Sequence, residues 1–146
     1  MSDGRERIAR KLVRIREIDE RVEILKARDA REKLAVAEEA EEESLTRKTK
    51  LAEEMDRKVS VGTTGATLVG YALLLDAATR SVEQTKVQRS AAGEIERRAS
   101  SRLLSAVRER QAAEKLADRL RDDARRERDR KEQRDLDEMA TQRFGR

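Results

Sequence analysis

The stretch Ser60-Val-Gly-Thr-Thr-Gly65 interrupts a chain that is otherwise rich in charged and small apolar residues with helical spacing. Gly62 suits the left-handed backbone position that follows a helix end, and Thr63 or Thr64 can cap the next helix. The 146-residue chain contains no proline, so a long helix can run on either side of this break. We therefore predict an all-α fold, a long antiparallel two-helix coiled-coil hairpin.

The hairpin is expected to form a single domain over residues 1–146. Its expected segments are a first helix over 4–59, a turn over 60–66 and a second helix over 67–142. Asp3 and Glu6 have the spacing of a capping box, which marks the start of the first helix. With the turn centred near residue 62, paired residues should have numbers that add up to about 125. This register places the acidic block of Glu38, Glu39 and Glu41 to Glu43 opposite Arg80, Lys86 and Arg89.

Apolar residues at alternating steps of three and four predict the seam between the helices. In the first helix the seam begins with Ile8, Leu12, Ile15, Asp19 and Val22. It continues with a phase slip, marked by the eleven-residue step from Leu34 to Leu45, through Leu34, Ala37, Glu41, Leu45, Ala52, Met55 and Val59. In the second helix they are Leu68, Leu75, Ala78, Val82, Arg89, Ala92, Ala99, Leu103, Ala106, Ala113, Leu116, Ala117 and Leu120. The alanines should let the two helices approach closely.

The second helix is expected to overhang the first. After Leu120 the apolar stripe stops, and thirteen of the fifteen residues 121–135 are charged, seven positively and six negatively. Residues 121–142 are therefore expected to form an unpaired arm. Apolar residues return at its end on one side of the helix: Leu136, Met139, Ala140 and Phe144. An apolar face without an internal partner favours a binding surface, and the alternative is fraying into disorder.

A second apolar cluster follows the turn. Tyr71, Leu74, Leu75 and Ala78 are spaced as one helix face, but Leu73, Leu74 and Leu75 are consecutive and cannot all face the partner helix. Two interpretations remain open: the cluster closes the end of the hairpin, or part of it is an exposed docking patch for another protein.

The composition excludes several function classes. Charged residues make up 45% of the chain and aromatic residues 1%, with no cysteine and no histidine. The chain therefore lacks the commonest general base, a thiolate nucleophile and the usual transition-metal ligands. The glycine-rich stretch 62–70 lacks the lysine of a phosphate-binding loop. We expect no catalytic residue, no metal site, no cofactor and no enzymatic activity.

The charge pattern and the apolar runs limit the partners. The net charge is +4 with the two signs interleaved, which argues against a nucleic-acid binder. The longest apolar run, 66–75, is much shorter than the ~20 residues that a membrane span needs. The first residues lack the apolar core of a secretory signal. A cytoplasmic protein without direct membrane insertion is expected.

Two segments resemble the flagellar export protein FliJ family. The ending Arg130-Lys-Glu-Gln-Arg-Asp-Leu-Asp-Glu-Met-Ala-Thr-Gln-Arg-Phe144 is similar to that family's charged C-terminal run. The segment Tyr71-Ala-Leu-Leu-Leu-Asp-Ala-Ala-Thr-Arg-Ser-Val82 is similar to its pattern of one tyrosine followed by spaced aliphatic residues. The outline of the whole chain agrees with this resemblance, and about thirty residues carry it in detail.

The resemblance implies a stalk of the flagellar type III export apparatus. Such a stalk enters the hexameric ring of the export ATPase, promotes its assembly and activity, and links it to a membrane export-gate protein and to export chaperones. The residues implied for ATPase binding are Leu136, Asp137, Glu138, Met139, Ala140, Arg143 and Phe144. The residues implied for gate or chaperone binding are Tyr71, Leu74, Leu75 and Ala78. The implied location is peripheral to the inner membrane at the flagellar basal body, with a role in flagellum biogenesis, motility and chemotaxis.

Two alternative functions remain open at the level of the sequence. One is the equivalent stalk of a virulence type III secretion ATPase. The other is a purely structural coiled coil that associates with copies of itself, although the break near residue 62 favours folding back into a hairpin and thus a monomer in isolation.

Overall fold

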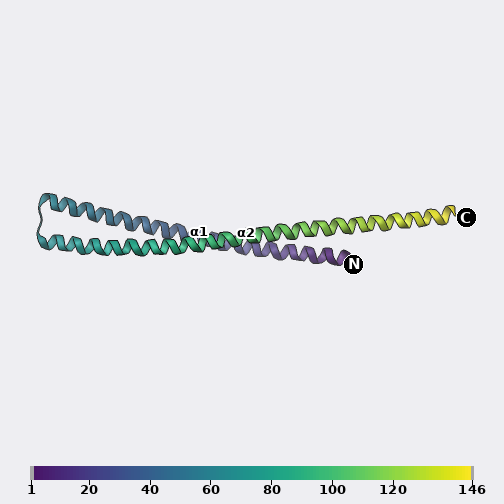
Figure 1. The fold of residues 1–146 in the computed structure, drawn as a ribbon, viewed down its shortest axis with the longest axis horizontal. Helices are drawn as coiled ribbons and strands as arrows, with labels where there is room; N and C mark the ends of the chain where they lie inside the picture. The colour runs from purple at the N-terminus through teal and green to yellow at the C-terminus, as the bar shows by residue number, and fades with distance from the viewer. Residues whose placement is uncertain (1, 146) are drawn as a thin grey trace. The chain divides into compact units, whose positions relative to one another are not determined.

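The fold consists of two long helices joined by a short turn (Figure 1). A computed structural model describes residues 2–145 of the chain. Helix α1 comprises Ser2–Val61 and helix α2 comprises Gly65–Phe144, and the described residues include no strand. The helices pack against each other in opposite directions, which confirms the predicted all-α helical hairpin. The finer division into a domain, a turn and an unpaired arm stays a prediction.

The turn is built by local backbone chemistry. Gly62 has a positive φ of 90°, and its N–H donates to the carbonyl of Val59 at 3.3 Å. This left-handed residue ends α1 at little steric cost because glycine has no Cβ. The Thr64 hydroxyl accepts a hydrogen bond from the Thr67 N–H at 3.3 Å, so Thr64 caps α2. Of the two predicted caps, Thr64 is the one used.

The chain divides into two compact units. The terminal unit combines residues 1–24 with residues 102–146, and the turn unit comprises Leu25–Ser101. Each unit contains a segment of α1 and a segment of α2 held together by its own contacts. A seam of buried and half-buried residues, spaced alternately three and four apart, runs along both segments of each unit.

In the terminal unit, the part of the seam on α1 contains acidic, basic and aliphatic residues: Glu6, Ala9, Val13, Arg16, Glu20 and Glu23. The predicted seam residues Ile8, Ile15 and Val22 are instead exposed, with 69%, 54% and 43% of their surface accessible. The predicted phase for this part of α1 was therefore wrong. Small side chains allow close packing, and Arg16 and Glu20 form ion pairs across the seam, whereas Glu6 pairs with Arg10 on its own helix.

In the turn unit, the seam of α1 keeps one uniform spacing: Ala27, Ala30, Leu34, Ala37, Glu41, Ser44, Lys48, Leu51 and Met55. The predicted phase slip between Leu34 and Leu45 is absent from this segment, because Glu41 and Ser44 carry the seam and Leu45 stays 46% exposed. The predicted stripe contained Ala37 and Glu41 but then took Leu45 in place of Ser44, because leucine is the more apolar of the two neighbours.

The seam of α2 follows the sequence pattern. All predicted positions from Leu68 to Leu120 are buried or half-buried except Leu116, which is 45% exposed. The buried apolar residues among those described are alanines: Ala9, Ala27, Ala30, Ala106, Ala113 and Ala124. Because each alanine buries little surface, the free energy of packing is spread along the seam rather than concentrated in a core.

The register is fixed by ion pairs between the helices. In the turn unit, Arg31 pairs with Glu96 at 3.9 Å and Arg89 pairs with Glu41. In the terminal unit, Arg16 pairs with Glu109 at 2.8 Å and Arg110 pairs with Glu20. The paired numbers add up to between 125 and 130, close to the expected sum.

Within residues 2–145, the predicted acidic block meets the predicted basic residues in one ion pair. Glu41 pairs with Arg89 across the helices, whereas Glu43 pairs with Arg47 on its own helix at 3.6 Å. Arg80 likewise pairs within its own helix, with Asp76 at 2.8 Å. Glu41 and Arg89 occupy seam positions, and the other three side chains lie on outward faces where the partner helix is out of reach.

Candidate binding surfaces

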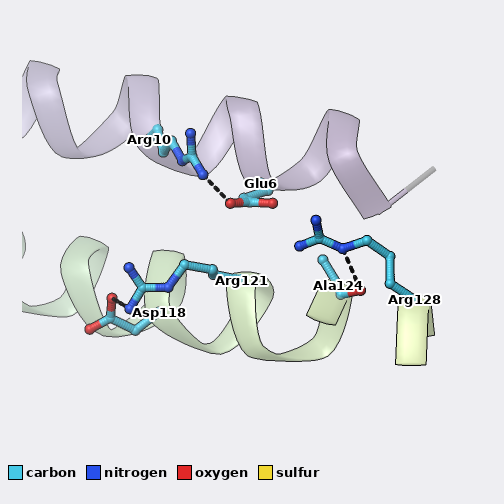
Figure 2. Close-up of polar contacts among 6 residues, drawn as sticks. All are labelled: Glu6, Arg10, Asp118, Arg121, Ala124 and Arg128. Carbon is cyan, nitrogen blue, oxygen red and sulfur yellow. Dashed lines mark hydrogen bonds and ion pairs between the residues drawn. The ribbon is translucent and has the colours of Figure 1, made fainter. Parts of the chain in front are cut away.

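The end of α2 is an exposed charged helix. Ala124 is the last seam residue, with 0% of its surface accessible, and residues 125–145 are all exposed. Figure 2 shows Ala124 facing the first turns of α1, where Glu6 accepts a hydrogen bond from Arg10. The guanidinium of Arg128 bonds back to the Ala124 carbonyl at 3.4 Å (Figure 2). From this turn onward, α2 has no seam.

The apolar residues near the end of α2 gather on one side of the helix. At 100° per residue, Leu136, Met139, Ala140 and Phe144 fall within one arc, which we call the C-terminal apolar arc. The side chains of Leu136, Met139 and Phe144 are 60%, 63% and 86% exposed. Arg143 lies inside the same arc. A helix surface with large apolar groups this accessible gains free energy when a partner covers it.

The C-terminal apolar arc lies on the opposite side of α2 from the seam. Continuing the seam spacing beyond Ala124 leads to Glu127, Lys131, Arg134, Glu138 and Thr141, which are all polar. Glu138 therefore points away from the arc, and Asp137 lies at the arc's edge. An extension of α1 along the seam would therefore not cover the arc.

Polar contacts hold the backbone of this segment in helical form. Asp137 accepts hydrogen bonds from the Gln133 amide at 3.1 Å and, at its carbonyl, from the Thr141 hydroxyl at 2.8 Å. The Gly145 N–H donates to the Thr141 carbonyl at 2.8 Å. These local bonds order the last turns without any contact that buries the apolar arc.

The residues predicted near the turn divide between two faces of α2. Tyr71, Leu75 and Ala78 occupy seam positions and are half-buried. Leu74 is 55% exposed and lies beside Leu73, which is 66% exposed. Three residues therefore pack toward α1 and the two leucines face outward, and docking of another protein on these leucines stays a prediction.

The segment that contains these leucines carries no charge. Residues 59–75 include no Asp, Glu, Lys or Arg, although such residues make up 45% of the chain. Val69, at 60% exposed, lies one helical turn from Leu73 and extends the outward apolar surface. We call Val69, Leu73 and Leu74 the turn-proximal patch.

Sequence reasoning missed one exposed apolar surface. Ile8, Ile15, Ile18 and Val22 lie on the outer side of α1 in the terminal unit, with 43% to 69% of their surface accessible. The spacing of Ala9 and Val13 indicated the true seam. The isoleucines were chosen instead because they are larger and more hydrophobic.

The guanidinium of Arg110 in the seam of the terminal unit has a shifted pKa. Arg110 donates hydrogen bonds to Glu114 and to Glu20, and these bonds raise the pKa of its guanidinium above the ordinary value. The bonded groups form an intrahelical and an interhelical ion pair around one cation. Such a site fixes packing and does not activate a nucleophile or a base.

The described residues show surface features rather than an enclosed reaction site. Residues 2–145 contain no helix apolar enough to cross a membrane and no group of acidic side chains placed to hold a metal ion. A groove of the terminal unit beside Val13 and Ala117 is lined mainly by arginine and acidic side chains.

The fold and these surfaces define an all-α helical-hairpin protein with large apolar side chains exposed on open helix faces. The family model described as Flagellar FliJ protein matches residues 10–146, so the chain belongs to the flagellar FliJ family, as predicted. It is accordingly a component of flagellar protein export, in a family whose members are not enzymes. No curated protein and no solved structure matches the chain in the other two comparisons.

Proposed function

We propose that this protein is the coiled-coil stalk of a flagellar type III export ATPase. Its C-terminal apolar arc binds inside the hexameric ATPase ring and promotes the ring's assembly and activity. Its other end contacts the membrane export-gate protein and export chaperones. The protein has no catalytic activity and acts by binding alone. The observation that carries this proposal is the exposed apolar arc at the end of α2, in a chain of the FliJ family.

The arc has the properties of a binding anchor. Phe144 is one of two aromatic residues in the chain, and it is 86% exposed. Burying it together with Leu136 and Met139 would contribute roughly 1.5 to 3 kcal/mol for each side chain, before the cost of ordering. Arg143 inside the arc and Asp137 at its edge supply both signs of charge, which orient the helix against a partner more than they add affinity, and Glu138 contacts the ring from the side that points away from the arc. Ala140 keeps the arc shallow at its centre.

The seam gives the predicted gate-binding residues two different roles. Leu74 contacts the gate protein or a chaperone directly, together with the accessible part of Tyr71. Leu75 and Ala78 pack toward α1 and hold this turn of α2 in place. Segment 59–75 next to the turn carries no charged side chain. An apolar partner surface can therefore cover it without removing water from charged groups.

The location follows from these contacts. The protein is cytoplasmic and is held at the inner membrane, at the flagellar basal body, by the ATPase and the gate rather than by a segment of its own. It is a monomer in isolation. Its loss would stop flagellum assembly and hence motility and chemotaxis.

The first experiment tests the C-terminal apolar arc with the export ATPase from the same cell. The double variant L136E/F144E places two charges in the arc, and V87E/L104E makes the same change at two exposed apolar sites elsewhere on α2. We expect pulldown of the ATPase and stimulation of its hydrolysis rate by the wild type and by V87E/L104E, and loss of both with L136E/F144E. ATPase binding by L136E/F144E equal to that of the wild type would overturn the assignment of the arc.

A second experiment addresses the turn-proximal end. The variant L73D/L74D changes two outward-facing leucines, and V87E/L104E again serves as the control. We expect L73D/L74D to lose binding to the cytoplasmic part of the gate protein, or to a chaperone, while its ATPase binding is unchanged. Full retention of both contacts would show that the patch is not a docking surface.

A further inference from the structure

The outer side of α1 in the terminal unit carries a second heptad stripe. Ile8, Lys11, Ile15, Ile18 and Val22 follow each other at steps of three and four, about half a turn away from the seam. The four apolar members are 69%, 54%, 58% and 43% exposed, and Lys11 is also exposed. This spacing places two stripe residues in every heptad, as in a coiled-coil seam.

One edge of this stripe is basic. Arg7, Arg14 and Arg21 recur at every seventh residue along one edge of the stripe, and all three are exposed. Within the described residues, none of these three guanidinium groups forms an ion pair. The carboxylates of Glu6 and Glu20 lie instead at seam positions, where Arg10 and Arg110 pair with them. The exposed row along this edge is therefore basic, while the opposite edge carries the exposed Asp19, which pairs with Arg16 at 3.7 Å.

We infer that this outer stripe binds an acidic amphipathic helix of another protein, which packs on α1 as a third coiled-coil strand. Isoleucine and valine at three positions of one heptad type suit knobs-into-holes packing against such a helix. The arginine row occupies the flanking positions that select a coiled-coil partner, and it requires glutamate or aspartate on the incoming helix. The stripe is separate from the surfaces assigned to the ATPase and to the gate, so the inference does not depend on the proposed function.

Two other occupants fit the stripe less well. A second copy of the chain would bring its own arginine row against this one in an antiparallel pairing, and Lys11 against Lys11 in a parallel one. A membrane surface favours a broad apolar face with aromatic residues, whereas this stripe is narrow and the chain's two aromatic residues, Tyr71 and Phe144, lie outside it.

The test uses the full-length protein and two synthetic four-heptad peptides. Both peptides carry isoleucine and leucine at their core positions; one has glutamate and the other has lysine at all flanking positions. Binding is measured by fluorescence anisotropy of the labelled peptide. We expect the glutamate peptide to bind at least about tenfold more tightly than the lysine peptide, with an affinity that falls as salt is added.

Three variants separate the stripe from the seam. I15E/I18E should weaken glutamate-peptide binding by about tenfold or more, while V87E/L104E leaves it unchanged. R7E/R14E/R21E should reverse the preference in favour of the lysine peptide. Circular dichroism should show unchanged helicity for all three variants, because every altered side chain is exposed.

Several outcomes would overturn the inference. One is equal binding of both peptides, and another is binding that I15E/I18E does not affect, as expected if the peptide only invades the seam. A wild-type dimer in sedimentation that I15E/I18E dissolves would assign the stripe to a second copy. Sedimentation with phosphatidylglycerol vesicles that depends on the stripe, without any peptide binding, would assign it to a membrane surface.

Discussion

Single residues fix the turn between α1 and α2. Gly62 adopts a φ of 90°, which costs an L-residue with a side chain roughly 1 to 2 kcal/mol. Gly65 follows the Thr64 cap in an ordinary helical conformation, and a Cβ placed on it meets nothing within 4 Å. Two glycines three residues apart therefore respond to the same substitution in opposite directions.

We expect Gly62→Ala to lower the free energy of unfolding by about 1 kcal/mol or more, because alanine is strained in the left-handed region. Gly65→Ala should raise it by about 0.5 to 1 kcal/mol, since alanine reduces the freedom of the unfolded chain. Urea denaturation followed by circular dichroism measures both. An unchanged midpoint for Gly62→Ala would mean that the turn tolerates another cap.

At the same scale, Arg110 adds stability without a pH switch near neutrality. Its hydrogen bonds to Glu114 and Glu20 raise its pKa. A base with a raised pKa keeps its full contribution below its ordinary pKa and loses it only as the pH rises past the folded value. For arginine this window lies far into the alkaline range, so the contribution of Arg110 is constant across physiological pH.

At the scale of the elements, charged seam residues lower the stability of the hairpin but specify the register of its two helices. Glu41 and Arg89 face each other in the turn unit, with 17% and 42% of their side chains accessible. A charged pair at a seam position costs desolvation but can match only one partner position on the other helix. A seam of alanine and leucine alone would slide more easily to a neighbouring register.

Replacing this pair tests whether it lowers the free energy of unfolding. We expect R89L alone to lower the free energy of unfolding by about 1 kcal/mol, because Glu41 is left without its partner. The double variant E41L/R89L should exceed the wild type by about 1 kcal/mol. Thermal unfolding of the wild type and both variants gives the comparison. A double variant less stable than the wild type would show that the ion pair itself holds the two segments together.

A related prediction concerns Gly93 in the helix interior of α2. A Cβ at this position would meet the Leu34 side chain at 3.8 Å, an ordinary contact. Gly93→Ala should therefore raise the free energy of unfolding by about 1 kcal/mol, the usual difference in helix propensity. A lower denaturation midpoint in urea would instead indicate that Leu34 cannot yield the space.

At the scale of the whole molecule, the buried seam ends at Ala124, whereas α2 continues to Phe144. Stability and binding are thus assigned to different stretches of one helix. Residues 125–145 contribute no buried surface of their own. A segment of this kind can present its apolar side chains to a partner without weakening the rest of the fold.

We expect a chain truncated after Ala124 to unfold within about 2 °C of the full-length protein, since the deletion removes no packed side chain. For comparison, Ala124→Glu places a charge at the last buried seam position, which has 0% exposure, and should lower the melting temperature by several degrees. Circular dichroism at 222 nm records both transitions. A large loss of stability on truncation would reveal a packing role for the segment.

The sequence by itself determined the helical class, the turn and the seam of α2. Each follows from local chemistry: the absence of proline, the backbone freedom of Gly62, the hydroxyl of Thr64, and evenly spaced alanines and leucines. The family also followed from short segments of sequence, and the match over residues 10–146 confirms it. The predicted ATPase and gate contacts stay predictions. Among the residues predicted for the gate, Leu74 is exposed, whereas Tyr71, Leu75 and Ala78 are half-buried.

Only the tertiary structure decided which face of α1 is buried in the terminal unit. Two stripes with the same spacing run along that helix, one with Ala9 and Val13 and the other with Ile8 and Ile15. Hydrophobicity favours the second stripe, but the partner helix offers Glu109 and Arg110, which pair with Arg16 and Glu20 of the first. A helix buries the face that its partner can approach and match in charge, and that choice depends on residues about ninety positions away in the chain.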